Sequence, residues 1–215
     1  MRTAGRGRWP LRAASAAGVA ALMLSLGCNI VGPAFLLVHG PEKVPQVYKL
    51  ERERPVVIFI DDREFNISRT PTRERVAAAA EWALLDAKAV DSVIDSKAAG
   101  AVVSGEPRGE LTPISEVGRK IGAEVVIYVV PDSFALSPDG QTFAPTATLR
   151  VKVLDAVADE RMWPEEREGY TLTVTASTRQ GTAPTDRAAV REAEGEFADL
   201  VGLRLAQLFY SHEIE

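Results

Sequence analysis

Two adjacent carboxylates directly follow an apolar run in the first half of the chain. Residues 56–60 are β-branched or aromatic throughout, which predicts a buried central strand, and Asp61 and Asp62 come next. Carboxylates at the carboxyl end of such a strand can bind Mg²⁺. No second acidic cluster follows another strand in this way, and no phosphate-binding glycine loop occurs. We therefore predict a solvated turn and no metal site, with Asp61 and Asp62 as the only metal candidates.

Other residues that could support catalysis are few. His39 lies in an apparent tether and His212 near the C-terminus, so neither suits a rigidly held general base. No serine sits in a G-x-S-x-G motif. Adjacent strand ends could bring Asp62 and Asp132 together, but the sequence does not fix their distance. We predict a protein that is not an enzyme and needs no cofactor; a metal-dependent hydrolase using the two adjacent aspartates is an alternative.

The only cysteine, Cys28, follows a basic and then an apolar segment. The cationic start contains Arg2, Arg6, Arg8 and Arg12. Residues 13–26 are uncharged and mostly apolar, and they are too few to form a stable membrane span of about 20 residues. This pattern predicts a signal peptide over residues 1–27. A mature chain with one cysteine at its start has no disulfide, zinc–thiolate site or cysteine nucleophile in its folded part.

Residues 24–28, Leu-Ser-Leu-Gly-Cys, resemble the lipobox of bacterial lipoproteins, although Ser25 and Leu26 stand in swapped order. The resemblance implies that the Cys28 thiol carries a diacylglyceryl group and that its freed amine is acylated, with chains such as palmitate. Two or more acyl chains would anchor the protein stably to a membrane. We therefore expect a place in the cell envelope, facing the periplasm or the exterior. An ordinary cleaved signal and an uncleaved anchor are the alternatives.

The segment after the lipidation site predicts a tether over residues 28–54, because glycines and prolines interrupt it repeatedly. Its most apolar part is more apolar than a tether needs and is a candidate interaction segment: Phe35, Leu36, Leu37 and Val38. The formal net charge of −5 includes the signal arginines, so the mature protein is more acidic still. That balance disfavours nucleic acid as a partner.

Residues 55–215 predict one domain of the α/β (α+β) class. We expect a single mixed β-sheet with helices packed on its faces, antiparallel hairpin strands in the second half, and a long C-terminal amphipathic helix. The first helix should begin with Thr72 as N-cap and lie on the first strand, with Trp82 at the rim or in the core. A weak strand near residues 90–94 and a short helix over 98–103 should follow.

Local signals are clearer in the second half. A helix from Ile114 ends at Gly122 and leads into a buried strand. Two strands, over residues 147–154 and 170–176, follow with turn signals between them, and the second alternates strictly. That alternation fits a half-buried outer strand and also a strand that lines a membrane pore. After residue 186, apolar residues at helical spacing predict the terminal helix.

Three stretches carry a wider resemblance: the lipobox, "ISEVGRKIGAEVVIYVV" and "LRVKVLDAVADERMW". With the first strand and the terminal helix they resemble envelope domains of the TolB amino-terminal and curli-secretion lipoprotein type, a group that includes lipoprotein activators of peptidoglycan synthases. "GCNIVGPAFLLVHGPEKVPQVYKL" and "FALSPDGQTF" look like an uncharacterised group of bacterial lipoproteins. We predict a non-catalytic, membrane-anchored envelope protein that binds a protein partner or itself; the alternative is a subunit of an oligomeric secretion channel.

Overall fold

The computed structural model describes residues 43–105, 111–176 and 184–213. The larger of two compact units is Pro45–His212. Two short strands, β1 (Lys43–Val44) and β8 (His212–Glu213), form a two-stranded sheet of their own. The expected signal peptide, Cys28 and residues 35–38 lie outside the described residues. Within those residues, no helix has the length and apolar character needed to cross a bilayer.

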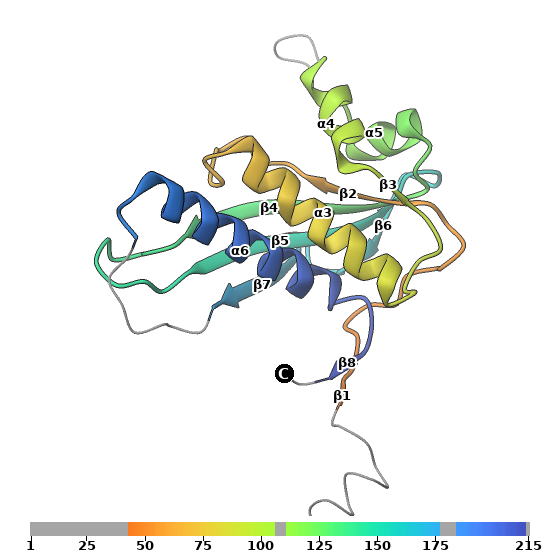
Figure 1. Ribbon diagram of the computed structural model, residues 1–215. Helices are drawn as coiled ribbons and strands as arrows, with labels where there is room; N and C mark the ends of the chain where they lie inside the picture. The colour runs from red at the N-terminus through yellow and green to blue at the C-terminus, as the bar shows by residue number, and fades with distance from the viewer. Residues whose placement is uncertain (1–42, 106–110, 177–183, 214–215) are drawn as a thin grey trace, which may run out of the picture. The chain divides into compact units, whose positions relative to one another are not determined.

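A mixed six-stranded sheet forms the centre of the larger unit, in the order β3-β2-β4-β5-β6, with β7 also paired to β5 (Figure 1). The strands are β2 (Val56–Ile60), β3 (Val93–Ile94), β4 (Val125–Ala135), β5 (Thr146–Asp155), β6 (Glu160–Trp163) and β7 (Tyr170–Thr175). The first three run parallel and the last three add antiparallel pairs. The predicted mixed sheet with antiparallel strands in its second half is confirmed.

Helices cover both faces of this sheet, and the two faces have separate cores. The helices α3 (Thr70–Asp86) and α6 (Arg187–Ala206) lie side by side on one face (Figure 1). The shorter α4 (Ser96–Ser104) and α5 (Ile114–Ile121) pack with residues of the other face. Because side chains alternate along a strand, Ile58 belongs to the first core and Phe59 to the second. The strand β2 is thus covered on both sides, as its composition predicts.

Close packing joins the two long helices. A Cβ atom added at Gly202 of α6 would meet the backbone of Val76 and the side chain of Ala79 on α3, both closer than atoms can approach. Alongside, the guanidinium of Arg75 makes two hydrogen bonds to the carboxylate of Asp199. The glycine therefore sets the separation of α3 and α6, while the ion pair lies exposed beside it.

The start of the first helix differs from the prediction. The N-cap of α3 is Arg69, whereas Thr72 is buried within the first turn, so the predicted N-cap is wrong. Pro71 stands in the first turn, where backbone N–H groups have no partner within the helix, so its missing N–H costs no hydrogen bond. The helix can therefore begin at Thr70, before the predicted start at Thr72. Trp82, farther along the same helix, is 66% exposed and lies outside the core. Gly122 ends α5 with a left-handed φ of 82°, as predicted.

Part of the expected tether belongs to the larger unit and packs within it. The amides of Val47 and Tyr48 donate to the carbonyl oxygen of Leu208 at 2.8 and 3.0 Å. The Tyr48 ring stacks on Trp163 with centroids 5.7 Å apart, and Leu50 is buried. Residues 45–50, which the sequence assigns to the tether, therefore lie along the end of α6 and the strand β6.

Candidate functional site

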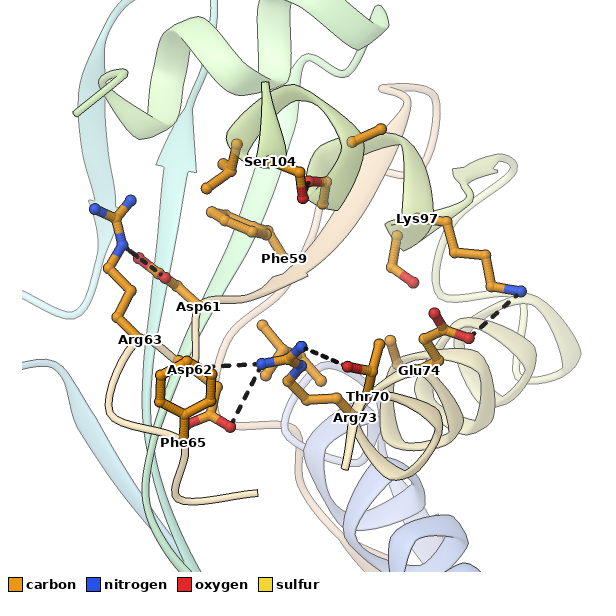
Figure 2. A pocket seen from close by; sticks show the side chains of 16 residues that line it. Phe59, Asp61, Asp62, Arg63, Phe65, Thr70, Arg73, Glu74, Lys97 and Ser104 are labelled. Atoms are coloured by element: carbon orange, nitrogen blue, oxygen red, sulfur yellow. Dashed lines mark hydrogen bonds and ion pairs between the residues drawn. The ribbon is translucent and has the colours of Figure 1, made fainter. Parts of the chain in front are cut away.

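A pocket of about 500 Å³ opens where β2 ends, between the first turns of α3 and the helix α4 (Figure 2). The residues that matter most in it are Phe59, Asp62, Phe65, Thr70, Arg73 and Lys97. Its position follows from the topology. The chain leaves β2 for β3 on one side, then crosses to β4 on the other side, and a crevice forms outside the strand at such a switch point.

The strand β2 is incompletely paired beside this pocket. Its pairing with β3 consists of Val56 with Val93 and Val57 with Ile94, whereas its pairing with β4 continues to Ile60. The chain turns away after Ile94 into α4. The last residues of β2 therefore have a strand on one side and the pocket on the other.

Asp61 is held from two directions at the mouth of the pocket. The Nε atom of Arg63 donates to its two carboxylate oxygens at 2.9 and 3.0 Å (Figure 2), and the hydroxyl of Tyr128 donates at 2.8 Å. Burial raises the pKa of Tyr128 well above its usual range, and the hydrogen bond to Asp61 adds to that effect. The Tyr128 hydroxyl consequently stays protonated and acts as a fixed donor to the carboxylate.

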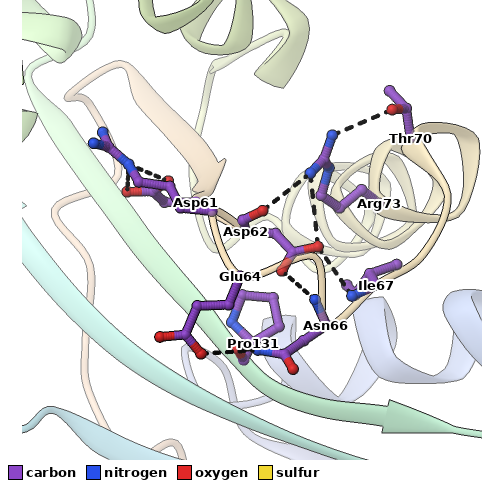
Figure 3. A network of polar contacts seen from close by, with 9 residues as sticks. Asp61, Asp62, Glu64, Asn66, Ile67, Thr70, Arg73 and Pro131 are labelled. Carbon is purple, nitrogen blue, oxygen red and sulfur yellow. Dashed lines mark hydrogen bonds and ion pairs between the residues drawn. The ribbon is translucent and has the colours of Figure 1, made fainter. Parts of the chain in front are cut away.

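Asp62 organises the loop after β2. Its carboxylate accepts hydrogen bonds from the backbone amides of Asn66 and Ile67 at 2.8 and 2.9 Å (Figure 3). The side-chain amide of Asn66 donates to the carbonyl oxygen of Pro131 at 3.0 Å, which ties the loop to β4. Asp61 and Asp62 are only 9% and 5% exposed, so the predicted solvated turn is in fact a buried one. The sequence carried no local signal for the contacts to Tyr128 and Pro131, which are more than sixty residues away.

The two aspartates were also the metal candidates. Their oxygens are engaged by the donors described above, and they point to different partners. Across the described ranges, no group of three or more His, Cys, Asp or Glu side chains could hold a metal ion. The arrangement that the structure gives to Asp61 and Asp62 is therefore one that stabilises a loop.

That loop presents Phe65 to solvent at the rim of the pocket. The side chain is 75% exposed, and the residue has a φ of 58°, a left-handed conformation that bulky residues rarely adopt. Its amide donates to the carbonyl oxygen of Asp62 at 3.3 Å. An aromatic ring is thus held outside the core by a hydrogen-bonded turn. No motif or spacing in the sequence marks Phe65 as a functional residue.

Two cations on the pocket wall make only long contacts to their neighbours. Arg73 lies 3.3 Å from the hydroxyl of Thr70, 3.5 Å from the carbonyl oxygen of Asp62 and 3.6 Å from the Asp62 carboxylate. Lys97 lies 3.7 Å from Glu74. Charge-assisted hydrogen bonds are usually about 2.7–2.9 Å long. The Asp62 side chain is fully buried, whereas Arg73 and Lys97 are partly open, so cationic groups face the pocket space.

The remaining predicted residues lie elsewhere. Asp132 pairs with Arg150, whose Nε and Nη2 atoms both approach it to 2.8 Å, and the structure does not join Asp132 to Asp62. His212 lies in β8 with its ring near the carbonyl oxygen of Tyr210, and it is not one of the residues that line the pocket. His39 is outside the described ranges. Arg73 and Lys97 were missed because their position beside β2 follows from how α3 and α4 pack.

Comparisons with known proteins give likenesses of fold alone. No family model and no curated protein matches the sequence. A PelC dodecamer from Paraburkholderia phytofirmans is 14% identical with a TM-score of 0.43, and the match covers 79% of this chain and 96% of that one. Lipoprotein GNA1162 from Neisseria meningitidis is 7% identical with a TM-score of 0.38, over 65% and 91% of the chains. The LpoB C-terminal domain from Salmonella enterica is 11% identical with a TM-score of 0.34, over 60% and 86%.

One of the structures that the chain resembles in fold is a lipoprotein. The resemblance to TolB amino-terminal and curli-secretion lipoproteins stays a prediction. At such low identities and TM-scores, the function of the pocket can be inferred only from its own residues.

Proposed function

We propose that this chain is a non-catalytic, lipid-anchored protein of the bacterial cell envelope whose α/β domain binds a partner protein at the carboxyl end of β2. The observation that carries the proposal is Phe65, an exposed aromatic residue in a left-handed conformation beside a pocket. Backbone in such a conformation costs free energy, and such strain concentrates at functional sites. Its position makes Phe65 a candidate anchor, because aromatic residues are enriched at the core of protein interfaces.

The way Phe65 is held supports binding rather than an incidental exposure. The Asp62 carboxylate accepts hydrogen bonds from the two backbone amides that follow Phe65. The side chain of Asn66 in the same turn donates a hydrogen bond to the carbonyl oxygen of Pro131. A ring on a rigid turn loses little conformational freedom on binding, so more of its contact energy appears as affinity. The pocket next to it offers a concave surface with both apolar and cationic groups.

The anchor part of the proposal rests on Cys28 and its lipobox-like surroundings. Acyl chains at that residue would hold the domain at a membrane and raise its effective concentration near a membrane-associated partner. Residues 35–38 remain a second candidate contact, because their apolar character exceeds what a tether needs. A nucleic acid partner is disfavoured by the acidic net charge.

The test is site-specific photocrosslinking in the native cell. A photoreactive p-benzoylphenylalanine at Phe65 should give one defined crosslinked product, identified by mass spectrometry. Val157, which is 64% exposed at the turn before β6, is the matched control position. The same products from both positions, or none from either, would contradict the proposal. A product between two copies of this chain would identify the partner as the protein itself.

A second measurement addresses the anchor separately. The intact mass and membrane partition of the mature protein are compared between wild type and Cys28→Ala. An acylated N-terminal Cys28, with the variant released or left unprocessed, supports the anchor. An unmodified thiol in a protein found in the soluble fraction overturns the tethering part and leaves the interaction at Phe65 to be judged by crosslinking.

A secretion-channel subunit is the alternative function, and it depends on β7. In that strand Val174 is buried in the core, while the neighbouring Thr173 and Thr175 are exposed. Packing against α6 and β5 thus accounts for the alternation without a pore. Rings that survive detergent, seen by electron microscopy of the extracted protein, would favour the channel instead.

A further inference from the structure

We propose that the pocket receives an extended peptide segment of the partner, which adds to the free edge of β2 and carries an acidic residue next to an apolar one. This inference rests on the proposed protein-binding function and specifies how the partner is recognised. It follows from three properties of the pocket: an unpaired strand edge, walls of different chemistry on the two faces, and reachable cationic charge.

The edge of β2 on the β3 side is unpaired over its last residues. The amide of Val56 donates to Ser92 on the β3 side, whereas the amide of Asp61 donates to Val129 of β4. In a parallel ladder, alternate residues bond to opposite neighbours, so the backbone groups of Ile58 and Ile60 face the β3 side. The pairing of Val57 with Ile94 uses the Ile58 amide, so the edge open to a new strand consists of the Ile58 carbonyl oxygen and the backbone of Ile60. Among the described strands, none pairs with β2 there beyond Val57.

The pocket lies where β3 would continue. It is bounded by Phe59 and Ile60 on one side and by Ser96 and Lys97 on the other, just after β3 has ended. Ile60 is partly exposed and lines the pocket. An extended peptide placed there would add a strand to the sheet, which is a common mode of peptide recognition.

The two faces of β2 set the side-chain pattern of such a peptide. Successive side chains of a paired strand point to opposite faces of the sheet. On the α4 face the pocket wall has an apolar part, Phe59 and Val103, beside the polar side chains of Ser96, Lys97 and Ser104. On the α3 face it presents Thr70, Arg73 and Glu74, whose carboxylate lies 3.7 Å from Lys97 (Figure 2). One peptide side chain would therefore meet an apolar wall, and the next would meet a cation and a hydroxyl group.

Charge selects an acidic residue for the α3 face. The carboxylates of Asp61 and Asp62 accept hydrogen bonds from their own donors, and that of Glu74 lies 3.7 Å from Lys97. Arg73 reaches Thr70, the Asp62 carbonyl oxygen and the Asp62 carboxylate only at 3.3, 3.5 and 3.6 Å. A peptide carboxylate would give Arg73 the shorter charge-assisted hydrogen bonds that it lacks. The start of α3 has no side-chain cap, so the positive end of its dipole favours the same charge.

The volume sets the length of the recognised core. About 500 Å³ lies within the range of small ligand sites and suits about three residues, with Phe65 at the mouth to cover them. The expected core is thus apolar–acidic–apolar, with both apolar side chains on the α4 face and the acidic one on the α3 face.

The experiment uses the full chain in detergent micelles with isotope-labelled isoleucine and valine methyl groups. The probes are two pools of acetylated tripeptide amides: glutamate between mixed apolar residues, and glutamine in the same setting. We expect NMR shifts at Ile60 and Val103, with binding at least tenfold tighter for the glutamate pool. Arg73→Gln should abolish the difference between pools. Arg69→Gln, a neighbouring cation outside the pocket, should preserve it.

Three results would overturn the inference. The glutamate and glutamine pools could bind wild type equally; N-acetylglutamate amide alone could reproduce the whole effect; or backbone N-methylation of the peptides could leave binding unchanged. The first removes the charge selection, the second indicates a small-acid site, and the third removes strand addition. If Phe65 still crosslinks one partner in cells while the pools fail, partner binding stands and this mode of recognition is wrong.

Discussion

The carboxylate of Asp62 accepts a hydrogen bond from the backbone amide of Ile67 at 2.9 Å, and both residues are almost completely buried. Asp62→Ala would leave that amide, and the neighbouring amide of Asn66, without their acceptor. An unsatisfied buried polar group costs about 1–3 kcal/mol, so we expect the free energy of unfolding to fall by about 2 kcal/mol. Urea denaturation followed by circular dichroism measures the change.

The matched control for that variant is Asp132→Ala. Its pairing with Arg150 is about one-third exposed, and exposed ion pairs contribute about 0–1 kcal/mol. Losses of equal size for the two variants would show that the Asp62 contacts are not the special support of the loop that the structure indicates.

The left-handed backbone at Phe65 can be tested by comparing the stabilities of two variants, Phe65→Gly and Phe65→Ala. The left-handed conformation costs a residue with a side chain about 1–2 kcal/mol, and glycine avoids that cost but loses about 0.5–1 kcal/mol in chain entropy. Phe65→Gly should therefore be more stable to urea than Phe65→Ala by about 0.5 kcal/mol. A glycine variant that is the less stable of the two would contradict the left-handed backbone at this position.

The separation of α3 and α6 can be tested with two identical substitutions. Gly202→Ala forces a methyl group against Val76 and Ala79, and overpacking of this kind costs about 1–3 kcal/mol. Gly100→Ala in α4 meets no atom within 4 Å, and alanine stabilises a helix by about 0.5–1 kcal/mol relative to glycine. Thermal unfolding should show opposite signs. A neutral Gly202→Ala would mean that the helices can move apart freely.

Glu81 predicts a dependence of stability on pH. Its carboxylate accepts the amide of Ser96 at 2.9 Å, and burial raises its pKa above the usual 4.5. The folded state therefore holds a proton to higher pH than the unfolded chain does. This contribution to stability is complete below pH 4.5 and is lost as the pH rises through the raised pKa.

Glu81→Gln keeps an acceptor for Ser96 and removes the titration. Relative to wild type, the variant should gain stability between pH 4 and pH 7, as measured by urea denaturation at each pH. Glu116→Gln, at a half-exposed carboxylate paired with Lys120 on α5, is the matched control. A wild-type and variant difference that stays constant over this range would refute the raised pKa.

Local signals predicted much of the fold. The helix from Ile114 to Ile121, its end at Gly122 and the strand that follows depend on spacing and a glycine cap, which act over a few residues. The terminal helix was predictable for the same reason. Thr72 failed as N-cap because Pro71 allowed an earlier start. The expectation of a lipid anchor at Cys28 comes from the sequence alone.

The candidate site was decided by tertiary structure. Asp61 and Asp62 were visible in the sequence, but their donors include Tyr128, and the loop they support is tied to Pro131, more than sixty residues away. Arg73 reaches the pocket only because α3 packs beside β2, and the pocket exists because β3 stops at Ile94. Spacing along a chain determines helices, strands and caps. Contacts between distant segments depend on how the whole sheet and its helices pack, so only the folded chain could bring these residues together.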